Sequence, residues 1–65
     1  MIIVDLIKEF MYQSGMSVNE LVDKTGLSYL VIKNIVDNDM IPTPEVAEKI
    51  LNVFGVTLEE VLSLY

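Results

Sequence analysis

The stretch that decides the fold spans residues 16–41 and reads MSVNELVDKTGLSYLVIKNIVDNDMI. Ser17 and Glu20 have the spacing of a capping box, in which each side chain satisfies a backbone donor at the start of a helix. The pattern therefore predicts a helix from Ser17 to about Thr25, and Gly26 supplies the positive φ of a sharp turn after it. The residues predicted to face inward are Leu21 and Val22.

A second helix is predicted to follow the turn, with Ser28 as its N-cap. It is expected to stop at Asp37-Asn38-Asp39, because these side chains bond to local backbone groups and compete with helical hydrogen bonds. Two short helices joined in this way form a helix-turn-helix unit over about residues 17–36. The expected inward side consists of Val31 or Ile32, together with Ile35.

The segment before this unit, residues 2–14, is predicted to be a helix that ends at Gly15. Its apolar residues recur every three or four positions, which is the spacing of one helix face. The β-branched start Ile2-Ile3-Val4 leaves a short strand as the alternative. The residues expected on the inner face are Ile3, Ile7, Phe10 and Met11.

Two further helix starts follow residue 41. Thr43 is the expected N-cap of a helix that ends at Gly55, with Pro44 in its first position. Thr57 and Glu60 form another capping box, which opens a last short helix. The chain is thus predicted to be all-α, with five helices in one domain over residues 1–65. The expected core residues are Ala47, Ile50, Leu51 and Phe54 in the fourth helix, and Val61 and Leu62 in the fifth.

The composition argues against catalysis and metal binding. The 65 residues carry a formal net charge of −6 and include no cysteine, histidine or arginine. A small helical domain has little room for a catalytic pocket built from carboxylates or lysine alone. The run Asp37-Asn38-Asp39 suggests a calcium loop, but the loop pattern then fails at Ile41 and Pro42. We expect no enzymatic activity, no cofactor and no metal site.

The apolar content of the chain bears on its partners, and its first residues bear on its location in the cell. Apolar residues make up 52% of the chain, more than a core of this size easily hides, so a homodimer is expected to cover the surplus. The apolar start is interrupted by Asp5, Lys8 and Glu9, too early for a membrane span or a signal peptide. We expect a cytoplasmic protein with no membrane contact.

The order of these features resembles the Cro and lambda-repressor type of helix-turn-helix, also called the xenobiotic-response-element (XRE) family. The resemblance covers nearly the whole chain and implies a DNA-binding transcriptional regulator, in many relatives a dimeric repressor. The motifs that carry it are Gly15-Met16-Ser17, Glu20-Leu21-Val22, Gly26-Leu27-Ser28, Ile32 with Ile35, Pro42, and the closing segment from Phe54 to Leu62.

Three departures from the family fall where its members touch DNA. Val18 stands where a phosphate-binding glutamine is usual, and Met11 stands where an arginine is common. Where relatives carry glutamate, glycine and then basic residues at the end of the third helix, this chain has Val36, Asp37, Asn38 and Asp39. The core positions match the family and the contact positions do not.

In this fold the start of the third helix lies in the major groove. Lys33 could donate to guanine, Asn34 could pair with adenine, and Leu30 could meet a thymine methyl group. The candidate base-reading residues are Tyr29, Leu30, Lys33 and Asn34, and the candidate phosphate contacts are Ser28 and Lys24.

A protein-binding role for the same face is the alternative. An apolar centre with Asp37 and Asp39 at its rim suits a partner with a basic face, such as another DNA-binding protein. The chain would then act as an antirepressor or modulator. The candidate residues for this face are Val18, Tyr29, Leu30, Val36 and Met40.

The C-terminal end is expected to form the dimer contact, as it does in many relatives, with a frayed terminus as the alternative. The dimer candidates are Val53, Leu58, Leu62, Leu64 and Tyr65.

Overall fold

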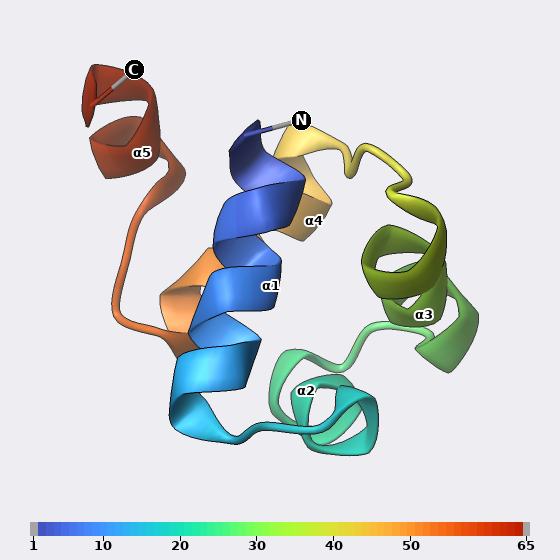
Figure 1. The fold of residues 1–65 in the computed structure, drawn as a ribbon. Helices are drawn as coiled ribbons and strands as arrows, with labels where there is room; N and C mark the ends of the chain where they lie inside the picture. The colour runs from blue at the N-terminus through green and yellow to red at the C-terminus, as the bar shows by residue number, and fades with distance from the viewer. Residues whose placement is uncertain (1, 65) are drawn as a thin grey trace.

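The computed structural model describes residues 2–64, with side chains from residue 3 to residue 63. These residues form five helices and no strand, so the all-α prediction is confirmed and the alternative of an N-terminal strand is wrong. Figure 1 shows α1 crossing the middle of the molecule, with α3 and α5 on opposite sides of it. The helices are α1 (Ile2–Ser14), α2 (Val18–Thr25), α3 (Tyr29–Asn38), α4 (Pro44–Val53) and α5 (Leu58–Leu64).

Two capping boxes fix the starts of α2 and α5. The Glu20 backbone N–H donates to the Ser17 hydroxyl at 3.1 Å, and the Ser17 N–H donates to the Glu20 carboxylate at 3.3 Å. Thr57 and Glu60 make the same two bonds at 3.1 and 3.4 Å. Gly26 follows α2 at a φ of 72°. The predicted starts and turn are therefore confirmed.

The helix α3 ends within the run Asp37-Asn38-Asp39, as predicted. Asp37 and Asn38 belong to the helix, and Asp39 alone adopts the left-handed conformation, with a φ of 53°. Both residues have partners one turn earlier: Lys33 pairs with Asp37 at 2.6 Å, and Asn34 accepts a hydrogen bond from Asn38 at 2.9 Å.

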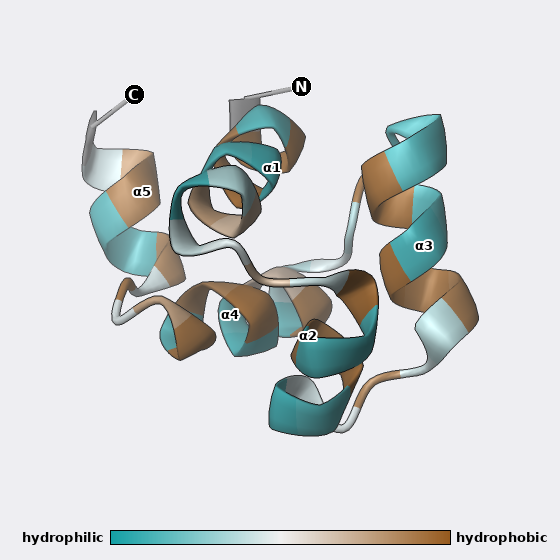
Figure 2. Cartoon of the chain, turned by 60° about the horizontal axis from the view of Figure 1, so that its bottom comes forward, coloured by the Kyte–Doolittle hydropathy of each residue, from teal (hydrophilic) through white to brown (hydrophobic). Residues whose placement is uncertain are grey.

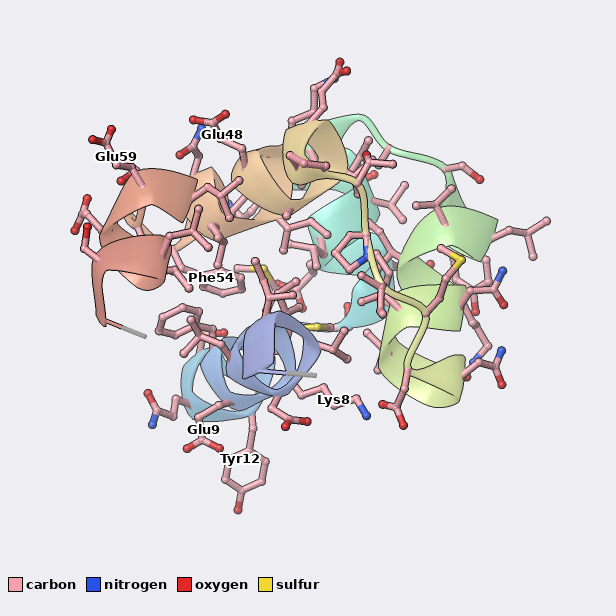
Figure 3. The ribbon with its side chains drawn as sticks, turned by 90° about the horizontal axis from the view of Figure 1, so that it is seen from above. Lys8, Glu9, Tyr12, Glu48, Phe54 and Glu59 are labelled. Carbon is pink, nitrogen blue, oxygen red and sulfur yellow. The ribbon has the colours of Figure 1, made fainter. Side chains whose placement is uncertain are left out.

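The helix α4 ends earlier than predicted, before Gly55. The helix stops at Val53, because the Phe54 N–H donates to the Leu51 carbonyl three residues back, at 2.9 Å, and Gly55 then takes a φ of 76°. Phe54 is half-buried, and its ring stacks on Phe10 of α1 with the centroids 5.2 Å apart. In Figure 3, Phe54 points from the end of α4 toward α1.

The core sits between α1, α2, α3 and α4. The helix α1 packs on α3 and α4, α2 packs on the same two helices, and α5 packs chiefly on α4. In Figure 2 the hydrophobic residues of α3 lie mainly on its side toward α1 and α2. The buried apolar residues are Ile3, Val4, Ile7, Met11, Leu21, Ile32, Ile35, Ala47, Ile50, Leu51 and Val61.

One predicted core residue is on the surface. Leu62 is 68% exposed, whereas the adjacent Val61 is buried. Among the described helices, α5 packs chiefly on α4, and its Leu62 side is left uncovered. On α3 the two alternatives are resolved in favour of Ile32, which is fully buried, while Val31 is half-buried. Within residues 2–64, none of the helices has the length and apolar character needed to cross a membrane.

Candidate nucleic-acid interface

The outer face of α3 presents the four residues predicted to read bases. Positions 29, 30, 33 and 34 share one side of a helix, because residues three and four apart are neighbours on its surface. Leu30 is 69% exposed and Tyr29 is 45% exposed, and Lys33 and Asn34 are half-exposed. Ile32 and Ile35 anchor the opposite face in the core. The structure therefore brings the four residues together on one accessible surface.

Both polar residues of this face already have partners within α3. The Lys33 ammonium lies 2.6 Å from the Asp37 carboxylate. The hydrogen bond to Asp37, helped by its charge, raises the pKa of Lys33 above its ordinary value. Asn34 accepts a hydrogen bond from the Asn38 amide at 2.9 Å, which leaves its own NH2 group free to donate among the described contacts. Sequence reasoning identified Lys33 and Asn34 but not these partners.

The start of α3 differs from the starts of α2 and α4. Ser28 begins α3 through its carbonyl, which accepts from the Ile32 N–H at 3.2 Å, but its hydroxyl makes no capping bond. Ser28 therefore occupies the predicted N-cap position, but it does so without a capping bond from its side chain. The third residue of α3 is Val31, which has no carboxylate to complete a capping box. The exposed Ser28 hydroxyl is left available to a ligand.

Lysines are few, and two of the four are paired with aspartates. Lys8 of α1 bonds to Asp39 at the end of α3, and Lys33 bonds to Asp37. Lys24 is exposed in the last turn of α2, and Lys49 is exposed on α4. Neither of these two forms an ion pair with any residue from 2 to 64. Lys24 is therefore the cation next to α3 that is free to meet a phosphate.

The Lys8–Asp39 pair joins α1 to the end of α3, and the sequence analysis did not foresee it. Figure 3 shows Lys8 pointing from α1 toward the loop after α3. The hydrogen bond from Lys8 holds the pKa of the Asp39 carboxyl below its ordinary value. The same bond raises the pKa of Lys8. The sequence held one signal for the position of Asp39, but none for its partner. Aspartate tolerates the left-handed conformation, so Asp39 was a candidate for the residue that ends α3.

The exposed apolar face expected for a protein partner contains fewer residues than predicted. Val18 and Val36 are half-buried and pack against the core, so they are not exposed as expected. Tyr29, Leu30 and Met40 are exposed. Ile41, which is not among the predicted residues, is 62% exposed in the loop after α3.

The dimer candidates fall into three groups. Val53 and Leu58 are half-buried and pack against the core. Leu62 is exposed on α5. The side chain of Leu64 and all of Tyr65 lie outside the described part of the chain.

A family comparison identifies the fold and its class. The model of the Cro/C1-type helix-turn-helix DNA-binding domain matches residues 7–65. The chain belongs to this family. No curated protein and no solved structure matches the chain. The Cro/C1-type domain is a DNA-binding module, and this membership supports a DNA-binding regulator.

Proposed function

We propose that this Cro/C1-type domain is a transcriptional repressor that binds its operator as a homodimer, with α3 in the major groove. The observation that carries the proposal is the division of α3 into two faces. Ile32 and Ile35 are fully buried, while Tyr29 and Leu30 project outward beside the polar groups of Lys33. In helix-turn-helix proteins the second helix of the unit lies in the major groove and touches base edges with its first residues.

Each residue of the outer face has a distinct role in this proposal. The Lys33 ammonium donates to guanine, and the Asn34 amide pairs with adenine. Leu30 meets a thymine methyl group, and Tyr29 makes a stacking or apolar contact beside it. The side chains lie on the first two turns of α3, and in helix-turn-helix proteins the N-terminal residues of this helix contact base edges.

Phosphate contacts would come from the ends of α2 and α3. The Ser28 hydroxyl is free of a capping bond and stands at the first turn of α3, where unpaired backbone N–H groups favour an anion. Lys24 adds a positive charge in the last turn of α2. These contacts would position α3 without selecting a sequence.

The homodimer would use the C-terminal end. Leu62 is exposed on α5, a helix that has chiefly α4 as its neighbour, so a second copy could cover it. Two reading helices about one turn of DNA apart, roughly 34 Å, would then require an operator with two-fold symmetry.

Binding to a mixed pool of duplexes tests the proposal. The full chain is mixed with a labelled random pool at about 50 mM and about 200 mM salt, and retained duplexes are sequenced. We expect retention at the lower salt, enrichment of a symmetric site, and loss of binding in the Lys33→Glu variant. If no duplex is retained at the lower salt, the DNA mechanism is wrong.

A second candidate function is binding to a protein with a basic face. Exposed Met40 and Ile41 follow α3 directly, and the lysines nearest to them are held by Asp37 and Asp39. Such a surface offers apolar contact and acidic groups to a DNA-binding partner. Under this alternative, Leu30→Asp would disrupt binding far more than Lys33→Glu. Under DNA readout, Lys33→Glu would be at least as damaging.

A further inference from the structure

The Lys33–Asp37 pair presents a donor and an acceptor side by side on the reading face of α3. The Lys33 Nζ and the Asp37 Oδ2 lie 2.6 Å apart, and their side chains are 45% and 47% exposed. Both belong to the same helix, one turn apart, so their relative position is set by α3 itself. Any ligand that meets Lys33 also meets a carboxylate.

Helix stability does not account for Asp37. Asp37 is the residue before the last one of α3, and a negative charge near the C-terminus of a helix opposes the helix dipole. The pair also has its cation first, which is the less favourable order along a helix. An exposed ion pair contributes little in any case. A contact between the Asp37 carboxylate and a bound ligand therefore explains its position better than helix stability does.

We infer that Lys33 and Asp37 act together to read one guanine–cytosine base pair, an inference that rests on the proposed placement of α3 in the major groove. Guanine presents two adjacent acceptors there, N7 and O6, and cytosine presents the N4 amino donor beside them. The Lys33 ammonium donates to the two acceptors while the Asp37 carboxylate accepts from the cytosine amino group.

An adenine–thymine pair fits the same unit less well. Its adenine amino donor lies between two acceptors, the adenine N7 and the thymine O4. A carboxylate placed over this amino group has the adenine N7 on one side and the thymine O4 on the other. Both atoms are acceptors, so both repel the carboxylate. Asp37 therefore converts Lys33 from a general donor into a selective one. It also cancels one positive charge, so selectivity is gained at the expense of sequence-independent attraction.

The test compares base preferences of three variants with those of the wild type on the same duplex pool. Asp37→Asn removes the carboxylate charge, and the double variant Lys33→Asp with Asp37→Lys reverses the pair while keeping the net charge. The matched control is Glu48→Gln, which changes the charge by the same amount as Asp37→Asn but lies on α4, across the view from α3 in Figure 3.

We expect the wild type to prefer guanine–cytosine at one position of each half-site by about fivefold or more. Asp37→Asn should weaken that preference, and Glu48→Gln should leave the preference unchanged. The double variant with the reversed pair should prefer cytosine on the strand where the wild type prefers guanine. If Asp37→Asn strengthens binding to all duplexes equally, Asp37 only repels phosphate and the inference is overturned. An unchanged preference in the reversed pair overturns it as well. Failure of the wild type to retain any duplex would instead refute the proposed function.

Discussion

Lys8 on α1 bonds to Asp39, which lies 31 residues later in the chain at the end of α3. Asp39 is also the one described non-glycine residue with a positive φ. The same residue thus ends α3 and ties it to α1. This contact between distant parts of the chain gives the stability of the domain a specific pH dependence.

The Lys8–Asp39 pair should stabilise the fold slightly at neutral pH, because both side chains are exposed to solvent, and should lose this effect at both extremes of pH. The pKa of Asp39 is lowered from its ordinary 3.8, so the stabilisation is present above that value and is lost as the pH falls through the lowered pKa. The pKa of Lys8 is raised from 10.5, so the stabilisation is present below that value and is lost as the pH rises through the raised pKa.

Thermal unfolding of the wild type and of Lys8→Met measures this effect. The difference in melting temperature should be constant from about pH 5 to about pH 9 and shrink below about pH 4. Lys49→Met, which removes an exposed lysine of α4, is the control and should show no such acid-side change. A Lys8→Met difference that persists unchanged into strong acid would contradict the assignment.

The two serines that begin α2 and α3 should behave differently when replaced by alanine. Ser17→Ala removes a capping box and should lower the free energy of unfolding by about 0.5–2 kcal/mol. Ser28→Ala removes a hydroxyl with no capping bond and should leave stability nearly unchanged while weakening DNA binding. Urea unfolding of both variants measures the change in stability, and duplex titration measures the change in DNA binding. Equal loss of stability would show that Ser28 caps α3 in solution.

Ile32 and Leu30 of α3 should also differ when they are replaced. We expect the change at Ile32 to affect stability and the change at Leu30 to affect DNA binding. Ile32→Val removes one methylene from the core and should lower the free energy of unfolding by about 0.5–1.5 kcal/mol. Leu30→Ala acts on a residue that is 69% exposed and should change stability by less than about 0.5 kcal/mol. In duplex titrations the Leu30 variant should bind more weakly, and the Ile32 variant should bind as the wild type does.

The salt dependence of DNA binding should reveal which lysines touch phosphate. Each phosphate contact contributes about 0.9 to the slope of log K against log salt. Lys24→Gln should therefore reduce the slope by about 0.9 per protomer, whereas Lys49→Gln on α4 should leave it unchanged. A reduction of equal size in both variants would indicate a general charge effect with no specific contact by Lys24.

The local signals in the sequence were sufficient for most of the fold. Ser17 with Glu20, and Thr57 with Glu60, lie three residues apart and satisfy each other, so the starts of α2 and α5 depend on a few neighbouring residues. The glycine after α2 is equally local, because its positive φ requires no distant contact. Such features are predictable from spacing alone.

The run at which α3 ends was predicted, but the exact residue within it was less predictable for a physical reason. Asp37, Asn38 and Asp39 all favour turns, and which of them leaves the helix depends on their partners. Lys33 and Asn34 pair with the first two from within α3, and Lys8 pairs with the third from another helix. A bond across 31 residues depends on how α1 packs on α3, which no local pattern contains. The same limit applies to Leu62, whose exposure follows from the position of α5.

The weak attachment of α5 has a consequence for how the domain opens. It packs chiefly on α4, and Val61 is its buried residue among those described. Local opening costs least where few apolar contacts are broken, so the amide hydrogens of α5 should exchange with solvent well before those of α1 to α4. Helix α3 would then stay folded while α5 detaches. A second copy bound to α5 would slow this exchange in proportion to its occupancy.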